Sequence, residues 1–151
     1  MIQSMVEEIL TLSSNSAPVT FTTDCIRTRS ANNCGGWLCH STGSPLYKIL
    51  QGGQYRVTFN TNISSSATGV VALGLYVDGI LVPGTTVIAD IATAGSYYNL
   101  AFDKVVPICC NSNTTLTIAS VPSVLSGATP AATITQVPTI QNANLTITKE
   151  H

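Results

Sequence analysis

Residues 72–87, ALGLYVDGILVPGTTV, contain two apolar runs with an Asp-Gly pair between them and a Pro-Gly pair near the end. An Asp-Gly pair between apolar runs is a strong hairpin signal, because both residue types tolerate the positive φ angles of a tight turn. The one carboxylate of the stretch, Asp78, is explained by this turn. The stretch therefore predicts two short antiparallel strands and provides no catalytic group.

The run at residues 70–77 has one large apolar face and one smaller face. Successive side chains of a strand point to opposite sides, which places Val71, Leu73, Leu75 and Val77 on one face and Ala72, Gly74 and Tyr76 on the other. Such a strand fits between its own core and a close neighbour. We expect sandwich packing or a subunit interface here, with Tyr76 as a contact residue.

The same two-residue period recurs through most of the chain after residue 18. Residues 55–64 place Tyr55, Val57 and Phe59 on one face and polar residues on the other. Further strand patterns lie at residues 19–28, 47–50, 96–106, 114–122 and 144–150. Roughly seven or eight short strands with almost no helix signal predict an all-β antiparallel sandwich or barrel. Residues 126–140 are low in charge and carry two prolines, which predicts a long loop or a broken edge strand.

Residues 1–18 follow a different pattern and are predicted to form an arm and linker ahead of a β domain at residues 19–151. Apolar residues recur at helical spacing, and Ser4 and Glu7 have the spacing of a capping box. Residues 13–18 look like a linker. Two interpretations are open, a frayed tail and an arm that anchors the protein on a neighbour. If the arm is separate, removing residues 1–17 leaves the domain folded and abolishes attachment. The proposed anchoring residues are Ile2, Met5, Val6, Ile9 and Leu10.

The composition favours a structural or binding role. Only 9% of the residues are charged, 44% are hydrophobic and the net charge is −1. A neutral surface rich in Thr, Ser, Asn and Gln suits close packing against other copies of the chain. The basic residues are scattered, which argues against nucleic-acid binding, and no run is long enough to span a membrane. Glu7 and Glu8 near the start do not fit a secretory signal, so we expect synthesis in a cytoplasm.

The five cysteines leave three interpretations open. Cys34, Cys39 and His40 cluster in CGGWLCH, which raises zinc binding, although four residues separate the two cysteines and Cys109 and Cys110 are adjacent. A disulfide between Cys34 and Cys39 is the second interpretation. Buried free thiols that act as small hydrophobic residues are the interpretation that we favour.

No residue pattern predicts catalysis. Cys39 and His40 are neighbours on a strand and point to opposite faces, so they form no nucleophile pair. The sequence has no phosphate loop, dinucleotide fingerprint or HExxH motif. Asp90 and Asp103 could bind calcium on a symmetry axis, but carboxylate-poor sites bind calcium weakly. We predict a non-enzymatic protein without cofactor or metal; an enzyme would need Asp24, His40 or a cysteine to converge in a cleft.

Several aromatic residues are candidates for contacts with a partner. Tyr97 and Tyr98 are adjacent and must point to different faces, so at least one of them is expected at the surface or in a contact. With Trp37 they could form a shelf for a glycan, although core or interface packing is the commoner use of such residues.

Three segments together resemble the C1q/TNF-like jelly-roll family. These are GGQYRVTFNTNIS (52–64), VVALGLYVDGILVPGT (70–85) and NANLTITKE (142–150). The likeness is to the bacterial and phage type, such as the C-terminal domain of the exosporium collagen-like glycoprotein of spores. CGGWLCHSTGSPLYKILQGGQYRV (34–57) is also similar to small virion proteins of phages and prophages of gut Firmicutes. The 151 residues hold no Gly-X-Y repeat, which departs from the spore pattern and favours a stand-alone particle protein.

The resemblance implies a homotrimer of jelly rolls around a threefold axis, without enzymatic activity. In a phage it implies a capsid decoration protein on the virion surface, made in the host bacterial cytoplasm and bound to the major capsid protein. The alternative is a trimeric head domain of a fibre or surface filament that binds a glycan or a host receptor. In either case Trp37, Tyr76, Tyr97 and Tyr98 are the expected trimer or partner contacts.

Overall fold

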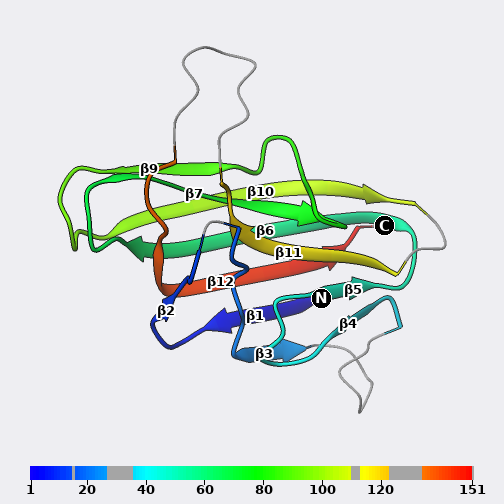
Figure 1. The fold of residues 1–151 in the computed structure, drawn as a ribbon. Helices are drawn as coiled ribbons and strands as arrows, with labels where there is room; N and C mark the ends of the chain where they lie inside the picture. Colours follow the sequence, from blue (N-terminus) through cyan, green and yellow to red (C-terminus); the bar gives the residue numbers. More distant parts are fainter. Residues whose placement is uncertain (15, 27–35, 110–112, 123–133, 151) are drawn as a thin grey trace.

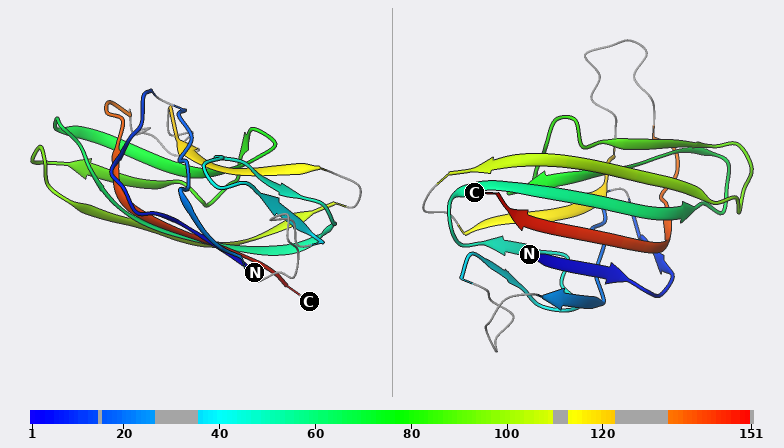
Figure 2. Two further views of the ribbon diagram at one scale, coloured as in Figure 1. Left: turned by 90° about the horizontal axis from the view of Figure 1, so that it is seen from below. Right: turned by 180° about the vertical axis from the view of Figure 1, so that it is seen from behind.

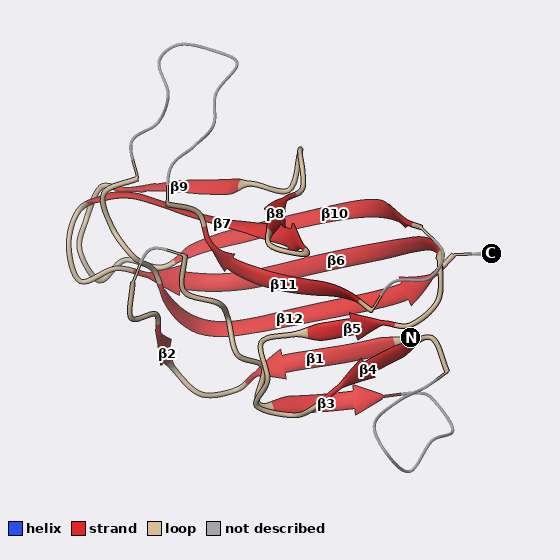
Figure 3. Ribbon diagram, turned by 45° about the vertical axis from the view of Figure 1, so that its right-hand side comes forward, coloured by secondary structure: helices blue, strands red, loops and turns tan. Residues whose placement is uncertain are grey.

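The computed structural model describes residues 1–14, 16–26, 36–109, 113–122 and 134–150, and these residues form β-strands and no helix (Figures 1 and 3). No part of the described chain is a helix with the length and hydropathy needed to cross a membrane. The strands are β1 (Ile2–Val6), β2 (Leu10–Thr11), β3 (Thr23–Ile26), β4 (Leu38–His40), β5 (Tyr47–Ile49), β6 (Gly53–Ser64), β7 (Gly69–Val77), β8 (Ile80–Leu81), β9 (Val87–Ile91), β10 (Tyr98–Ile108), β11 (Thr114–Ser120) and β12 (Thr139–Lys149).

The strands form two antiparallel sheets that stack face to face, as the edge-on view shows (Figure 2, left). Sheet A has the order β10-β6-β12-β1-β3, with β2 also paired to β12. Sheet B has the order β4-β5-β11-β7-β8, with β9 also paired to β7. Most neighbours within a sheet are distant in sequence, as in a jelly roll. The prediction of an all-β antiparallel sandwich is confirmed.

The hydrophobic core lies between the sheets, where the two-residue period predicts it. Tyr55, Val57 and Phe59 of β6 are fully buried, whereas the residues between them are exposed. Leu73 and Leu75 of β7 meet them from sheet B. Burying a large apolar side chain contributes about 1.5–3 kcal/mol, so these alternating positions fix which face of each strand points inward.

The Asp-Gly pair forms the predicted turn between β7 and β8. Asp78 and Gly79 have φ angles of 49° and 79°. Asp78 Oδ1 accepts hydrogen bonds from the backbone N of Thr115 at 2.7 Å and from Thr115 Oγ1 at 3.1 Å. The turn therefore also fixes the start of β11, which is the neighbour of β7 in sheet B.

The helical arm predicted for residues 1–18 is wrong. Residues 2–6 form β1, which lies inside sheet A between β12 and β3. The exposed fraction is 0% for Ile2 and 2% for Val6, so neither side chain is available to anchor the protein elsewhere. Apolar residues at positions 2 and 6 fit a buried strand face as well as a helix face, and tertiary pairing decided between them. Ala17 and Val19 in turn hydrogen-bond along β11, so residues 16–19 are part of the sandwich.

The small face of β7 is covered by the chain itself. Ala72 packs in a small buried cluster with Val121 and Ile134. A Cβ atom added at Gly74 would lie 2.6 Å from Leu81 Cδ1 and 3.1 Å from Val121 Cγ2. The close neighbour expected for this face is therefore, over most of β7, another segment of the same chain. Of the predicted loop at residues 126–140, Thr139 and Ile140 belong to β12, and residues 126–133 lie outside the described residues.

Candidate functional site

The outer face of sheet A is a broad surface of polar, mostly uncharged side chains. Strand register gives it successive rows across the sheet. One row joins Met5, Asn144, Asn60 and Ala101, and a second joins Asn142, Asn62 and Asn99. Neither row contains an ionisable side chain. This face is built from β6, β10, β12 and β1, and their inward positions supply much of the core.

Side-chain amides on this face hydrogen-bond to one another. The Asn99 amide nitrogen donates to Asn60 Oδ1 and Asn62 Oδ1, both at 3.1 Å, and Asn62 donates to Asn142 Oδ1 at 3.1 Å. Gln3 reaches Asn144 Oδ1 at 3.4 Å. The amides thus form a ladder across the strands with a fixed pattern of remaining donors and acceptors. A hollow of about 360 Å³ opens beside it, between Met5 and Asn144.

The charges of this face are gathered at the end where β6 begins, where Arg56 pairs with two carboxylates. Arg56 lies 3.2 Å from Asp103 and 3.1 Å from Glu150. The side chains are 51%, 51% and 39% exposed, so the pairs contribute little to stability. Their effect is to leave the face without a strong net field. Asp103 is engaged by Arg56 and Thr58, which places it in this cluster rather than in a calcium site with Asp90.

The outer face of sheet B carries an apolar groove of about 490 Å³ beside Tyr76. Thr117 of β11 lies opposite Tyr76 of β7 in the strand register, and Ala119 pairs with Pro18. At this point the neighbour of β11 changes from β5 to residues 17–19. The groove forms where this change leaves the strand face uncovered. Its lining contains no charged side chain: Ser16, Pro18, Pro45, Leu46, Tyr76, Gly79, Thr117 and Ala119.

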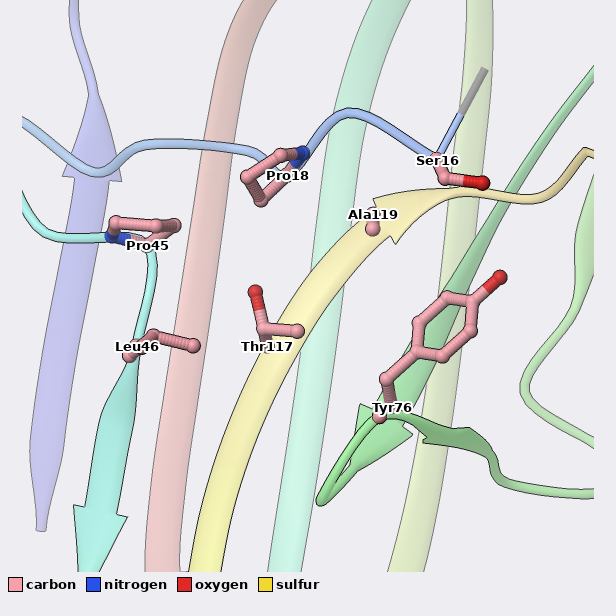
Figure 4. A pocket seen from close by; sticks show the side chains of 8 residues that line it. Ser16, Pro18, Pro45, Leu46, Tyr76, Thr117 and Ala119 are labelled. Atoms are coloured by element: carbon pink, nitrogen blue, oxygen red, sulfur yellow. The ribbon is translucent and has the colours of Figure 1, made fainter.

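Figure 4 shows the Tyr76 ring on one side of the groove and Pro45 and Leu46 on the other, with Thr117 on the strand between them. Leu46 is 42% exposed. The Thr117 hydroxyl is shielded from solvent and has no hydrogen-bond partner among the described residues. Partial burial raises the pKa of the Tyr76 phenol. The groove can therefore accept an uncharged group with an apolar surface.

In Figure 1, β2 and the start of β10 lie at the end of sheet A opposite the chain termini. Two large apolar side chains next to these strands are exposed. Ile9 is 69% exposed and lies beside β2, and Tyr97 is 72% exposed and precedes β10. The register places both strands at the same end, because Leu10 and Ile63 both pair with Ile140, and Tyr98 pairs with Ile63. Of the predicted anchoring residues, Ile9 is the one left largely exposed; Met5 and Leu10 are half-buried.

A buried polar cluster joins the two sheets at the β3–β4 edge, and the sequence did not predict it. Asp24 of β3 lies 2.7 Å from His40 Nδ1 of β4, with side chains 5% and 0% exposed. Ser4 Oγ of β1 donates to Asp24 at 2.5 Å, and His40 Nε2 lies 2.9 Å from the Ser44 carbonyl oxygen. The Tyr47 ring stacks on the imidazole with centroids 3.9 Å apart.

This cluster brings together Asp24 and His40, the convergence that an enzyme would require, but it is not arranged for nucleophilic catalysis. Ser4 contacts the carboxylate rather than the imidazole, and the second ring nitrogen is occupied by a backbone carbonyl. In a serine nucleophile site the histidine lies between serine and carboxylate. The geometry therefore does not give Ser4 a histidine as its general base. The sequence carries only a weak signal of this cluster: Ser4 and His40 occupy positions in short strands whose side chains point into the core.

The aromatic residues proposed as contacts do not form one shelf. Trp37 packs against Tyr55 with ring centroids 5.4 Å apart, near the start of β6. Tyr98 pairs with Ile63 near the end of the same strand. Eight residues of strand separate Tyr55 and Ile63, which is about 26 Å. The Tyr98 hydroxyl accepts a hydrogen bond from Ala92 N at 3.1 Å. Tyr76 and Tyr97 thus remain as candidate contacts on two separate surfaces.

The cysteines differ from the interpretation that we favoured. Cys39 is disulfide-bonded, which excludes its thiolate as a zinc ligand. Cys25 is a free thiol but is exposed rather than buried. Cys34 and Cys110 lie outside the described residues. Within the described part of the chain, no group of three or more His, Cys, Asp and Glu side chains is placed to hold a metal ion.

Comparison with solved structures shows the fold. The globular domain of zebrafish complement 1qA superposes with a TM-score of 0.62 at 12% identity, over 99% of this chain and 96% of that chain. Murine APRIL superposes with a TM-score of 0.53 at 11% identity, over 95% and 96% of the two chains. No protein-family model and no curated protein sequence matches the chain. The molecule is therefore a C1q/TNF-like jelly roll, and at this identity the similarity concerns the fold alone.

A carbohydrate-binding module of family 35 from Cellvibrio japonicus also matches, with a TM-score of 0.42 at 13% identity over 95% of this chain and 98% of that chain. Its lower score leaves it as a general likeness between β-sandwiches.

Proposed function

We propose that the chain is a non-enzymatic structural protein of a bacteriophage virion, a trimeric decoration protein that sits on the capsid and stabilises it. The main support for the trimer is the amide-rich outer face of sheet A, which carries few charges. The C1q/TNF-like fold and the resemblance to phage proteins support the setting. The low charge of the chain supports assembly rather than a solitary existence.

The outer face of sheet A is suited to self-association. Several of its amide side chains are held by hydrogen bonds to one another, so little side-chain entropy is lost when a second copy packs against them. Its charges are paired at one end. Polar groups buried in an interface must find partners, and a ladder of amides provides donors and acceptors that an identical face can match.

Light scattering coupled to size exclusion tests the trimer. Three chains of 15.8 kDa should elute together as a particle of about 47 kDa. Asn60→Lys places like charges in the centre of the interface and should give monomers that remain folded. Ile80→Lys adds the same charge to a residue that is 74% exposed on sheet B and should remain trimeric. A wild-type monomer at micromolar concentration would contradict the proposal.

The end of sheet A that carries Ile9 and Tyr97 is the proposed surface for the major capsid protein. It replaces the separate arm, whose residues Ile2 and Val6 are core residues. Exposed large apolar side chains are typical of the centres of protein interfaces. In a trimer through sheet A, this end of each copy would face the same way, away from the termini.

Particles of the phage or prophage that encodes the chain provide the second test. Mass spectrometry should detect the protein in purified capsids, and the double variant Ile9→Asp, Tyr97→Asp should lose binding to undecorated capsids while it remains trimeric. Ile80→Asp, which adds the same kind of charge to an exposed side chain on sheet B, is the matched control. If the protein is absent from the particles, or is found only on tail fibres, the capsid role is wrong.

A binding head is the second candidate function, and the groove beside Tyr76 is the observation that favours it. An aromatic ring with nearby apolar walls and few polar groups is typical of small-ligand sites, and its volume falls in their usual range. A glycan array probed with the trimer tests this. Binding that is lost in Tyr76→Ala would support a receptor-binding head, and an array without hits would argue against it.

A further inference from the structure

We propose that the groove beside Tyr76 binds an uncharged, proline-rich peptide segment in the extended polyproline II conformation. This assignment rests on the second candidate function, the binding head, and names a peptide rather than a glycan as its ligand. Four features of the groove point to this class of ligand: its walls, its lack of charge, the backbone pairing of its floor and the hydroxyl groups at its rim.

The walls of the groove are built from rings. The Tyr76 ring forms one side, and Pro45 forms the other side together with Leu46, as Figure 4 shows. Pro18 also lines the groove. A proline ring has almost no side-chain entropy to lose on binding, and a tyrosine has only two rotatable side-chain bonds. Grooves lined by aromatic rings are the usual binding sites of polyproline II peptides.

Among the described residues, no charged side chain lines the groove. An ionised ligand group would give up its hydration here without gaining a partner, which is costly. Burial raises the pKa of the Tyr76 phenol, so this hydroxyl stays neutral at physiological pH. The ligand is therefore uncharged along the length that lies in the groove.

The strands that form the floor already use their backbone groups within the sheet. Tyr76 of β7 pairs with Thr117 of β11 on one side and with Leu81 of β8 on the other. Further along β11, the carbonyl oxygen of Ile118 accepts a hydrogen bond from Val19 N at 2.7 Å. An added β-strand would find no ladder to extend, and its own backbone groups would be left unpaired.

A polyproline II segment does not need such a ladder. It has no internal hydrogen bonds and keeps its backbone solvated, and each of its prolines lacks an N–H donor. It presents carbonyl oxygens, which accept hydrogen bonds. An amphipathic helix would instead need anchoring contacts over about two turns, more than a hollow of about 490 Å³ provides.

The hydroxyl groups at the rim are donors that match these carbonyl oxygens. Ser16 and Tyr76 supply them on the side of the groove away from Pro45 (Figure 4). In the described part of the chain neither hydroxyl has a hydrogen-bond partner. Ser16 is held at a φ angle of 72°, which is unfavourable for a serine and persists only where the surrounding structure imposes it. The Thr117 hydroxyl is shielded and is not counted among the donors.

A glycan matches these groups less well. The hydroxyl groups of a sugar need several hydrogen-bond partners when they leave water. Besides Thr117, the described lining contains two side-chain hydroxyls and no amide, carboxylate or guanidinium group. The groove therefore favours a peptide over a sugar.

Titration of the nitrogen-15-labelled protein with decaproline tests the ligand class. We expect TROSY NMR shifts at Leu46, Tyr76, Thr117 and Ala119, with a dissociation constant on the order of 1 mM because the contact is small. A Gly-Ser peptide of the same length is neutral but flexible, and it should leave these signals unchanged. Equal shifts with both peptides, shifts confined to other surfaces, or no shifts with decaproline would overturn the assignment.

Two variants place the contact on opposite walls of the groove. Tyr76→Ala removes the aromatic wall and Leu46→Asp puts a charge into the other wall, and each should weaken decaproline binding by at least about tenfold. Leu46 is 42% exposed, so Leu46→Asp keeps the fold even if Tyr76→Ala disturbs it. Ile88→Ala removes an exposed apolar side chain elsewhere on sheet B and should bind like the wild type. Unchanged binding in Leu46→Asp would contradict the assignment.

The results also distinguish a wrong ligand from a wrong function. If decaproline does not bind, but a glycan binds and is lost in Tyr76→Ala, the binding head stands and the peptide ligand is wrong. If decaproline binds to a protein that light scattering shows to be a monomer, the peptide groove stands and the trimer is wrong.

Discussion

The outer faces of the two sheets are built in opposite ways. On sheet A, the outward side chains of β6 and β12 are mostly polar and uncovered, and several of their amides bond to one another and to Asn99. The outward side of β10 also carries the apolar residues Ala101, Val105 and Pro107. On sheet B, Ala72 and Gly74 of β7 are small, and Leu81 and Val121 of the same chain cover them. One sheet thus leaves a broad face uncovered, whereas the other uses its own chain as the cover.

This difference shows that a strand with small outward residues does not by itself predict a subunit interface. Small residues allow close approach, and the first segment able to approach here is intramolecular. The face that we propose for a partner is instead the one whose amide side chains hydrogen-bond to one another. On sheet B the groove beside Tyr76 stays uncovered, where residues 16–19 replace β5 beside β11.

The largest effect is expected from deletion of residues 1–12, which removes β1 from the middle of sheet A. The deletion exposes the edge of β12 and the core beside Ile2, so the chain should not fold. Circular dichroism and heteronuclear NMR would show this. Glu7→Gln, Glu8→Gln alters the same segment without touching the strand and should leave the spectra unchanged. If the deletion variant folds, residues 1–12 are not needed for the sandwich and the interpretation as a separate arm is right.

Gly74→Val sharpens the comparison of the two outer faces. The added side chain must displace Leu81 and Val121, and overpacking of this kind costs about 1–3 kcal/mol. Ala101→Val makes a similar change on the exposed face of sheet A and, in a monomeric background, should alter the free energy of unfolding by less than about 0.5 kcal/mol. Urea denaturation measures both. If both variants lose a similar free energy of unfolding, the outer faces of the two sheets do not differ in how closely they are covered.

Asp78 tests how the β7–β8 turn organises sheet B. Asp78→Gly keeps the positive φ angle but loses the hydrogen bonds to Thr115, so the free energy of unfolding should fall by about 1 kcal/mol. Asp78→Ala should cost about 1 kcal/mol more, because alanine is strained at this φ. Thermal unfolding would detect the difference. If the two variants are equally stable, the backbone conformation makes no contribution here.

The smallest effect on the single chain is expected for Asn99→Ala in the amide ladder. Its hydrogen bonds to Asn60 and Asn62 are exposed and its bond to the Thr61 carbonyl oxygen is part-buried, so the monomer should lose about 1 kcal/mol or less. The trimer should weaken more than the monomer, because the ladder is then disordered before association. Unfolding of a monomeric background and sedimentation of the trimer separate these two effects.

The predictions from the sequence succeeded where a local period of two coincided with a strong turn signal. The alternation of Tyr55, Val57 and Phe59 and the turn at Asp78 were both confirmed. They failed for residues 2–6, because a run this short satisfies both helical and strand periods. Pairing with β12, more than a hundred residues away, selected the strand.

The buried polar cluster between β3 and β4 shows a different limit. Ser4, Asp24 and His40 lie on three short strands whose pairing the sequence does not specify, so their meeting could not be inferred from spacing. The groove beside Tyr76 could not be inferred from spacing either, because its walls come from separate segments near residues 17, 45 and 76. Tyr76 was predicted as a contact, but the prolines opposite it were not.

The amino-acid sequence alone determined that this chain is a β-sandwich with a charge-poor surface, because alternation, turn residues and composition act locally or on average. Tertiary structure decided which strands became neighbours, and hence which small face was covered, which polar face stayed open and where a histidine met a carboxylate. Those outcomes depend on pairing between distant segments, which is set by the packing of the whole core and not by any one stretch of sequence.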